Sequence, residues 1–353
     1  MSEEYKPRIF FSENEHKELE EILGSPSVVK RDFLKEMLLE LCLNLNPSVS
    51  RNDILESSEL MSRLIREKSS RRTGVWIFYP WLNLAIRILD KEDFVYLRTC
   101  RNREKTTLAE QKKLEKKSIG IVGLSVGYSV LMAIALERIV EKIKIADFDT
   151  IELTNLNRIF QPLSNIGLNK AVTAARAVYE IDPYMEIEVF KEGILVDKNL
   201  KQFFGDSSEN SLDVIIDECD NGAVKLNLRL EARLRGIPVL MDTSDRSVLD
   251  IERYDLDSQY PLLHGMLEEY AECREINEEL GRKILFDSID FTKVSSRGKH
   301  SMELIGKSIR TWPQLGTDVL CGGVSVAIAA KKILLGESIH SQRIYIDLGS
   351  QIN

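Results

Sequence analysis

The stretch SIGIVGLSVG, residues 118–127, decides the fold. Its first half, Ser118 to Val122, predicts a short buried strand, and residues 128–139 predict an amphipathic helix. Gly123 and Gly127 therefore lie in a tight turn between a strand and a helix. Backbone N–H groups in such a turn point outward at the positive end of the helix, where they bind an anion such as phosphate.

A second predicted strand, residues 143–146, ends at Asp147. An acidic side chain at this place in a Rossmann unit accepts hydrogen bonds from ribose hydroxyls. Strands and helices then keep alternating, which predicts an α/β fold: a Rossmann-like, mostly parallel sheet with helices on both faces. The further expected helices span 169–179, 223–235 and 322–335, and the further expected strands span 186–190, 214–216, 239–241 and 343–348. Residues 287–316 show no clear period and are rich in Ser and Lys.

The chain before this region has a different pattern, so we expect a small, mainly helical N-terminal domain over 1–100 and a second domain over 101–353. Apolar spacing in the first part predicts helices over 14–23, 28–43 and 82–89, with one short β-like run at 75–79. Dense charge at 63–72 indicates a solvated segment.

Composition is that of an ordinary globular protein, with 43% apolar and 29% charged residues. The net charge of −8 argues against a general binder of nucleic acid or of anionic membranes. The N-terminal residues show no signal-peptide pattern and no apolar run is long enough to span a bilayer, so we expect a cytoplasmic protein. The five cysteines form no CxxC pair, which fits reduced thiols and no zinc site.

Polar side chains gather after the second strand, in DFDTIELTNLNR at residues 147–158. Loops at the carboxyl ends of parallel strands line the ligand crevice of such a sheet. We expect Arg158 and Lys170 to neutralise a triphosphate there, and Asn155 to hydrogen-bond a phosphate or a ribose. Asp149 adds a second carboxylate at the same place. An NAD-dependent oxidoreductase would also fit the glycine turn, but hydride transfer needs no such cluster of cations.

The strand over 214–216 also ends in acidic residues, in IIDECDN at residues 215–221. A carboxylate facing phosphates is costly unless a cation lies between them, so Asp220 is predicted to hold Mg²⁺, directly or through water. The alternative role for Asp220 is to cap the helix that follows it.

In this order, DFDTIELTNLNR, the tripeptide NKA at residues 169–171 and IIDECDN resemble the pattern of the ThiF/MoeB/E1-like activating enzymes. The resemblance covers roughly residues 100–255 and, more loosely, the apolar helix near the C-terminus. It implies ATP and Mg²⁺ as cofactors. By position it assigns ribose binding to Asp147, phosphate contacts to Asn155, Arg158 and Lys170, and the metal to Asp220.

The superfamily also takes an arginine from the partner subunit, from a segment ahead of the first strand. RTCRNREK at residues 98–105 offers Arg101 or Arg103 there, with Arg103 counted among the catalytic groups, so the resemblance implies a homodimer with composite sites. Peptide-modifying members of the MccB and PaaA type place a peptide-binding domain first. We therefore expect residues 1–100 to bind a peptide, with Val75–Tyr79 as the strand that pairs with it, or to serve only packing or dimerisation.

One departure from the family concerns the glycine loop. Its usual form is GxGGxG, whereas this chain has Ser125 and Val126 between Gly123 and Gly127. The predicted function is ATP- and Mg²⁺-dependent adenylation of a carboxylate on a peptide or small protein, as in ribosomal-peptide antibiotic biosynthesis. The alternatives are activation of the C-terminus of a ubiquitin-like sulfur carrier, and a non-catalytic nucleotide-binding scaffold, which the altered loop favours.

Overall fold

The chain forms two compact units. One comprises Met1–Leu108 with Asp182–Tyr184, and the other comprises Ala109–Ile181 with Met185–Asn353. The computed structural model describes residues 4–11, 16–56, 74–205, 207, 210–273 and 275–352, so the charged segment 63–72 lies outside the described residues. Within these ranges no helix combines the length and the apolar character that crossing a bilayer requires.

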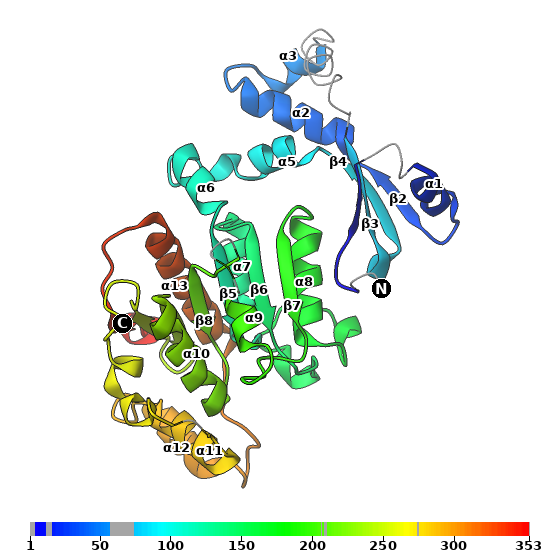
Figure 1. Ribbon diagram of the computed structural model, residues 1–353. Coiled ribbons are helices and arrows are strands. Elements are labelled where there is room, and N and C mark those ends of the chain that lie inside the picture. The colour runs from blue at the N-terminus through cyan, green and yellow to red at the C-terminus, as the bar shows by residue number, and fades with distance from the viewer. Residues whose placement is uncertain are drawn as a thin grey trace. The chain divides into compact units, whose positions relative to one another are not determined.

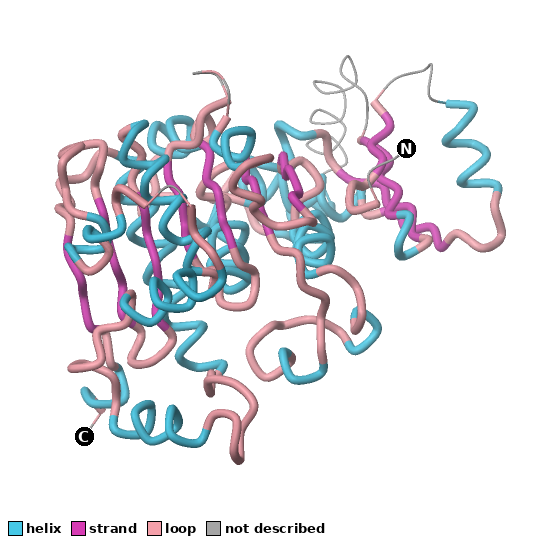
Figure 2. The backbone as a smooth tube through the Cα atoms, turned by 60° about the horizontal axis from the view of Figure 1, so that its bottom comes forward, coloured by secondary structure: helices cyan, strands magenta, loops and turns pink. Residues whose placement is uncertain are grey.

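The larger unit is built on a seven-stranded sheet (Figure 1). Its strand order is β11-β10-β9-β8-β5-β6-β7, and β9, β8, β5, β6 and β7 run parallel. Figure 2 shows these strands side by side with helices around them. The expected Rossmann-like sheet is therefore confirmed. The strands span Ser118–Val122 (β5), Lys142–Ala146 (β6), Glu186–Phe190 (β7), Val214–Asp217 (β8), Val239–Thr243 (β9), Val248–Glu252 (β10) and Gln342–Tyr345 (β11).

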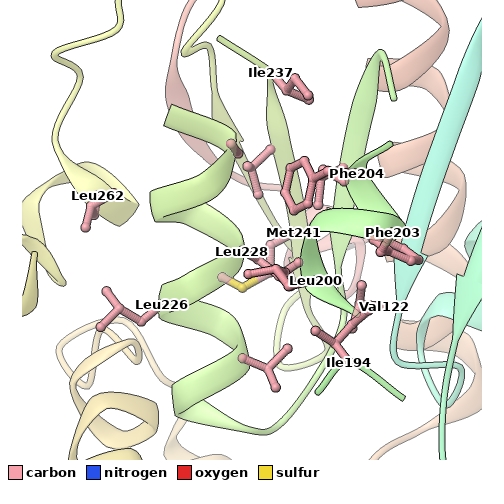
Figure 3. Packing of buried hydrophobic residues seen from close by; sticks show 14 of the residues in the cluster. Val122, Ile194, Leu200, Phe203, Phe204, Leu226, Leu228, Ile237, Met241 and Leu262 are labelled. Atoms are coloured by element: carbon pink, nitrogen blue, oxygen red, sulfur yellow. The ribbon is translucent and has the colours of Figure 1, made fainter. Parts of the chain in front are cut away.

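Helices cover both faces of this sheet. Met241 of β9 packs into an apolar cluster with Leu226 and Leu228 of α10 (Figure 3). The next residue, Asp242, lies against Gly322 of α13, because successive side chains of a strand point to opposite faces. The helices of the α13 side are α7 (Gly127–Glu137), α8 (Lys170–Ile181) and α13 (Gly316–Leu335), and those of the α10 side are α9 (Leu200–Phe204) and α10 (Gly222–Arg235).

Strand β5 is the point at which the chain changes direction across the sheet. From β5 it proceeds to β6 and β7 on one side, and it then returns to β8 on the other side. Ligands of open α/β sheets bind outside the carboxyl ends of the strands at such a switch point. The segments that follow β5, β6 and β8 are therefore the place to look for a site. Further helices of the described chain are α6 (Leu108–Leu114), α11 (Glu278–Asp287), α12 (Ser296–Leu304) and α14 (Leu348–Gln351).

The smaller unit contains a four-stranded sheet in the order β1-β3-β4-β2. Its strands span Arg8–Phe10 (β1), Val29–Asp32 (β2), Val75–Tyr79 (β3) and Leu84–Ile88 (β4). Its helices span His16–Gly24 (α1), Leu34–Leu45 (α2), Arg51–Glu56 (α3) and Lys91–Arg98 (α5). Helices and sheet thus make up this unit together.

Of the helices predicted for this unit, the one over 82–89 is wrong, and the one over 28–43 is wrong at its beginning. Within that first range, Leu84–Ile88 is strand β4, which pairs with β3 after a short turn that ends at Asn83, whose φ is 47°. The beginning of the range 28–43 is strand β2, which pairs in parallel with β4. Both segments are short, and pairing with a neighbouring strand decides their conformation more strongly than intrinsic propensity does.

The structure also contradicts the suggestion that Val75–Tyr79 pairs with a peptide. This strand, β3, is hydrogen-bonded to β1 on one side and to β4 on the other. Its backbone donors and acceptors are already used within the sheet, so an added strand has no edge to join there.

Candidate nucleotide-binding site

The glycine turn after β5 has the geometry that its sequence predicts. Gly123 has a φ of +87°, and a Cβ at this position would lie 2.5 Å from the carbonyl oxygen of Glu218. Only glycine fits such a backbone and such a close approach. Val126, by contrast, has ordinary helical angles (φ −76°, ψ −44°). The residue that replaces a family glycine there is therefore unstrained.

Asp147 connects the first two strands of the site. Its Oδ2 accepts a hydrogen bond from the Leu124 N–H at 2.6 Å, and its Oδ1 accepts one from the Asp149 N–H at 2.8 Å. Burial raises the pKa of this carboxyl, and the charge of Lys170 offsets only part of that effect. A carboxylate has about four lone-pair sites, so two remain to accept ribose hydroxyls.

Arg158 lies directly beside the glycine turn. Its Nε donates to the Ser125 hydroxyl at 3.0 Å, and its Nη1 donates to the Thr154 carbonyl at 3.2 Å. Burial lowers the pKa of the guanidinium, which nonetheless stays charged because arginine titrates far above neutral pH. Asn155 is buried, and its Oδ1 accepts from the Glu152 N–H at 2.9 Å. Asn155 thereby shapes the short helical turn, Leu153–Asn155, that leads into Arg158.

Lys170 begins helix α8, and its side chain is buried. Its Nζ lies 2.8 Å from Asp149 Oδ2, so an acidic partner holds this ammonium in place at the carboxyl end of β6. The preceding residue, Asn169, donates from Nδ2 to the Asp147 carbonyl at 3.0 Å and to the Lys191 carbonyl at 3.1 Å. The predicted residues Asp147, Asp149, Arg158 and Lys170 are therefore brought together around one turn.

Asp220 is exposed two residues beyond Glu218 on the segment after β8. It is not the cap of α10, because Asn221 takes that role and accepts from the Val224 N–H at 3.1 Å. The carboxylate of Asp220 is thus available to a cation. Within the part of the chain that the structure describes, no three His, Cys, Asp or Glu side chains gather as a metal-binding group.

The sequence reading missed two carboxyl groups beneath the turn. A Cβ at Gly127 would lie 3.4 Å from Glu218 Cγ, and Glu218 Oε1 accepts from the Asp242 N–H at 3.0 Å. Burial, together with the charge of Asp242, raises the pKa of Glu218 well above its usual range. Burial also raises the pKa of Asp242 to about 8, with the charges of Asp250 and Asp318 adding to it. The available signal was an acidic residue at the carboxyl end of each of two neighbouring strands, Glu218 directly after β8 and Asp242 in β9.

Tyr128, at the start of α7, points away from the turn toward the segment after Arg158. Its hydroxyl donates to the Phe160 carbonyl at 2.8 Å, and burial raises its pKa to about 12. The side chain is therefore fixed by its own hydrogen bond.

Arg101 and Arg103 belong to the other unit. The Arg103 guanidinium lies over the ring of Tyr96, 4.1 Å from its centroid. Its Nη2 is buried without a hydrogen-bond partner among the residues described.

Residues 98–245 match the ThiF family. The chain carries a ThiF-family domain. The family expected from the sequence is thereby confirmed, and the glycine turn, Asp147, Arg158, Lys170 and Asp220 all lie within the matched range of the ThiF-family domain.

Two curated proteins are similar to this chain in sequence. The uncharacterized protein MT1398 of Mycobacterium tuberculosis is 36% identical over 280 residues, which are 79% of this chain and 38% of that protein. Ubiquitin-like modifier-activating enzyme 5 of Drosophila mojavensis is 26% identical over 159 residues, which are 45% of this chain and 36% of the enzyme. The chain thus spans little more than a third of the length of either relative.

A solved structure shares the fold of the ThiF-family domain. The tRNA N6-threonylcarbamoyladenosine dehydratase TcdA of E. coli, in complex with AMP, superposes with a TM-score of 0.51 at 18% identity. The match covers 69% of this chain and 96% of TcdA.

Proposed function

We propose that this chain binds ATP at the glycine turn and uses it to adenylate a carboxylate. The observation that carries the proposal is the grouping of Asp147, Arg158 and Lys170 around the turn, with Asp147 bonded to the Leu124 N–H. A ribose-binding carboxylate and two phosphate-binding cations are the set that a nucleoside triphosphate requires. The match of residues 98–245 to the ThiF family supports the same activity.

The reaction joins a substrate carboxylate oxygen to the α-phosphorus of ATP, and the bond from that phosphorus to the bridging oxygen of pyrophosphate breaks. Arg158 and Lys170 stabilise the negative charge that grows on the phosphates, and Asp147 orients the ribose. The attacking group is already a carboxylate at neutral pH, so no general base is needed. Catalysis rests on positioning and on fixed charges.

Mg²⁺ suits this site although the residues that the structure describes form no closed set of ligands for the ion. The ion keeps several waters and commonly binds through one or two carboxylates together with the phosphates of its nucleotide. Asp220, exposed and without a capping role, provides one such carboxylate. When bound, the ion supplies Lewis-acid stabilisation of phosphate charge.

The carboxylate substrate that we propose is carried by a peptide. In the sheet of the smaller unit, the described edges are β1 and β2, since β3 and β4 each have two neighbours. All four residues of β2 are exposed, and its Lys30 and Arg31 give the edge a positive charge. A peptide with acidic side chains would add to this edge by main-chain hydrogen bonds. In such a role, this unit would present substrate in an antibiotic-type peptide pathway.

We further propose a homodimer in which Arg103 of one protomer completes the site of the other. Helix α13 exposes an apolar stripe at Leu320, Val324 and Ile328, and Phe160 of the segment after Arg158 is 92% exposed. Apolar side chains exposed in a row on one helix mark an association surface. Leu320→Glu combined with Val324→Glu should convert a dimer to a monomer in sedimentation velocity, and an unchanged mass would contradict this surface.

The test of the activity is ATP–pyrophosphate exchange, measured with an acidic peptide and with a carrier protein that ends in Gly-Gly. We expect exchange with the peptide, and we expect Asp220→Ala to abolish it without loss of the fold. Exchange with the Gly-Gly protein alone would favour sulfur-carrier activation. Normal exchange by Asp220→Ala would contradict the metal assignment.

A nucleotide-binding scaffold is the second candidate. It is favoured by the ion pair between Lys170 and Asp149, because that carboxylate competes with phosphate for the ammonium. Tight ATP binding without exchange for any carboxylate would support it.

A further inference from the structure

Residues 293–310 carry charge of a sign opposite to that of the whole chain. They contain five Lys and Arg residues and one Glu, a net charge of +4, in a chain of net charge −8. The cations are Lys293, Arg297, Lys299, Lys307 and Arg310, and all of them are exposed. We call residues 293–310 the basic segment. Across the described ranges, none of these five side chains has an ion-pair partner. Lys293 lies over the Tyr345 ring, 5.9 Å from its centroid, and the charges of the other four are open to a ligand.

The basic segment is anchored to the same sheet edge as the nucleotide site. Asp245 lies two residues past β9, and because β9 is parallel to β8, their carboxyl ends lie at the same edge of the sheet. Its carboxylate accepts from the Ser295 N–H at 2.7 Å and from the Ser295 hydroxyl at 2.8 Å. The Ser295 hydroxyl in turn caps α12 by accepting from the Gly298 N–H at 2.9 Å. One end of the basic segment is therefore fixed.

The chain just beyond the basic segment is fixed next to Arg158. Asn157 Nδ2 donates to the Gln314 carbonyl at 2.7 Å. A Cβ at Gly316 would lie 2.6 Å from the Asn157 carbonyl oxygen, so this approach is close enough to require glycine. The segment therefore leaves the sheet edge at β9 and returns to it beside a cation of the glycine turn.

Between these anchors, α12 lines an open hollow of about 420 Å³. Its lining residues are Ser296, Arg297, His300 and Ser301, which share one face of the helix. The Arg297 guanidinium, the Ser296 hydroxyl and the His300 imidazole are donors suited to carboxylates. The Ser301 hydroxyl already donates to the Arg297 carbonyl at 2.8 Å. The hollow and the exposed cations favour a ligand with several negative charges.

We propose that the basic segment binds the acidic side chains of a peptide whose carboxylate is adenylated at the glycine turn. This inference rests on the proposed function and adds a binding surface to it: the basic segment holds Asp or Glu residues that lie near the activated carboxylate of the peptide. Charge complementarity between exposed groups selects a partner and speeds its association. A nucleic-acid partner is disfavoured, because such proteins usually carry a broad basic excess and this chain is acidic.

Binding tests the inference separately from catalysis. Fluorescence anisotropy of the full chain is measured with fluorescein-labelled hexaglutamate and hexaglutamine peptides. We expect only hexaglutamate to bind, with an affinity that falls as salt rises. Arg297→Glu with Lys299→Glu should weaken that binding by about tenfold or more. These exposed positions lie in the first turns of α12, where a glutamate is compatible with the helix dipole, so the fold should persist.

The matched control reverses two exposed lysines elsewhere in the same unit, Lys198→Glu with Lys201→Glu, and should change the affinity by less than about twofold. Equal losses in both double variants, equal binding of hexaglutamine, or preference for a single-stranded RNA over hexaglutamate would overturn the inference. Loss of all carboxylate-dependent exchange with hexaglutamate binding intact would refute the proposed function alone. Full ATP–pyrophosphate exchange with an acidic peptide by the Arg297→Glu, Lys299→Glu variant would refute only the role of the basic segment in binding that peptide.

Discussion

Asp147 and Asp217 lie at the same edge of one sheet, but their carboxylates have different kinds of partner. Asp217, which ends β8, is fully buried and accepts from Lys225 Nζ at 2.8 Å and from the Arg229 guanidinium. Burial raises the pKa of Asp217, but the charges of Lys225 and Arg229 outweigh it and hold the pKa well below its usual range. Asp147, just past β6, instead accepts from two backbone N–H groups.

This difference separates a structural carboxylate from one arranged for a ligand. The cations around Asp217 are themselves fixed, since Arg229 Nε lies 2.8 Å from Glu252 Oε2. That network has no charge left to offer. Around Asp147 the partners are weaker donors, and the nearby cations Arg158 and Lys170 are oriented by Ser125 and Asp149 instead. The same residue type thus serves stability in one place and binding in the other.

The largest loss of stability should come from removing the buried carboxylate, Asp217. Asp217→Ala leaves Lys225 and Arg229 buried with too little negative charge, which we expect to lower the free energy of unfolding by about 3–5 kcal/mol. Urea denaturation followed by circular dichroism measures it. Asp220→Ala, three residues on but exposed, is the control and should change stability by less than about 0.5 kcal/mol. Equal stability of the two variants would show that the buried network is not structural.

A smaller effect is expected on the ligand side, at the turn itself. Gly123→Ala places a Cβ against the Glu218 carbonyl at a left-handed backbone, which should cost about 1–3 kcal/mol of stability and abolish ATP binding. Gly281→Ala in α11 is the control, because a Cβ there meets nothing closer than 3.9 Å. Thermal unfolding measures the change in stability, and calorimetric titration measures ATP binding. ATP binding retained by Gly123→Ala would mean that the turn is not the phosphate site.

The carboxyl group of Asp242 sharpens the comparison through pH. Its folded-state pKa is raised to about 8, so folding favours the protonated form, and the stability contribution is lost as pH rises from about 4 toward 8. Asp242→Asn removes this titration. Over that window, the free energy of unfolding of the variant, relative to that of the natural chain, should rise by up to about 1.4 kcal/mol per pH unit. Urea denaturation at several pH values measures both. If the free energies of unfolding of the two chains changed equally with pH, Asp242 would not carry a buried proton.

The smallest effect concerns the hydrogen bond that fixes Tyr128. Tyr128→Phe leaves the Phe160 carbonyl without that donor and should cost about 1 kcal/mol of stability. Because the ring itself is kept, ATP affinity should stay the same. A marked change in affinity would show that the hydroxyl contacts the nucleotide.

The sequence was enough to predict the parallel sheet and the grouping of Asp147, Arg158 and Lys170. In βαβ units, local periodicity fixes each element, and the carboxyl ends of parallel strands must meet at one edge. It was not enough for Val29–Asp32 and Leu84–Ile88, where partner strands decide the conformation. It also missed Glu218 and Asp242, because their hydrogen bond joins residues 24 positions apart that meet only where β8 lies beside β9.

Calorimetric titration with ATP and Mg²⁺ tests the central claim most directly. The natural chain should bind one nucleotide per protomer, and Arg158→Ala, which removes the cation beside Ser125, should weaken the affinity by about tenfold or more. The control is Lys201→Ala in α9, which should bind ATP with the affinity of the natural protein. Unchanged affinity in Arg158→Ala, or no heat of binding in the natural chain, would contradict a nucleotide site at the glycine turn.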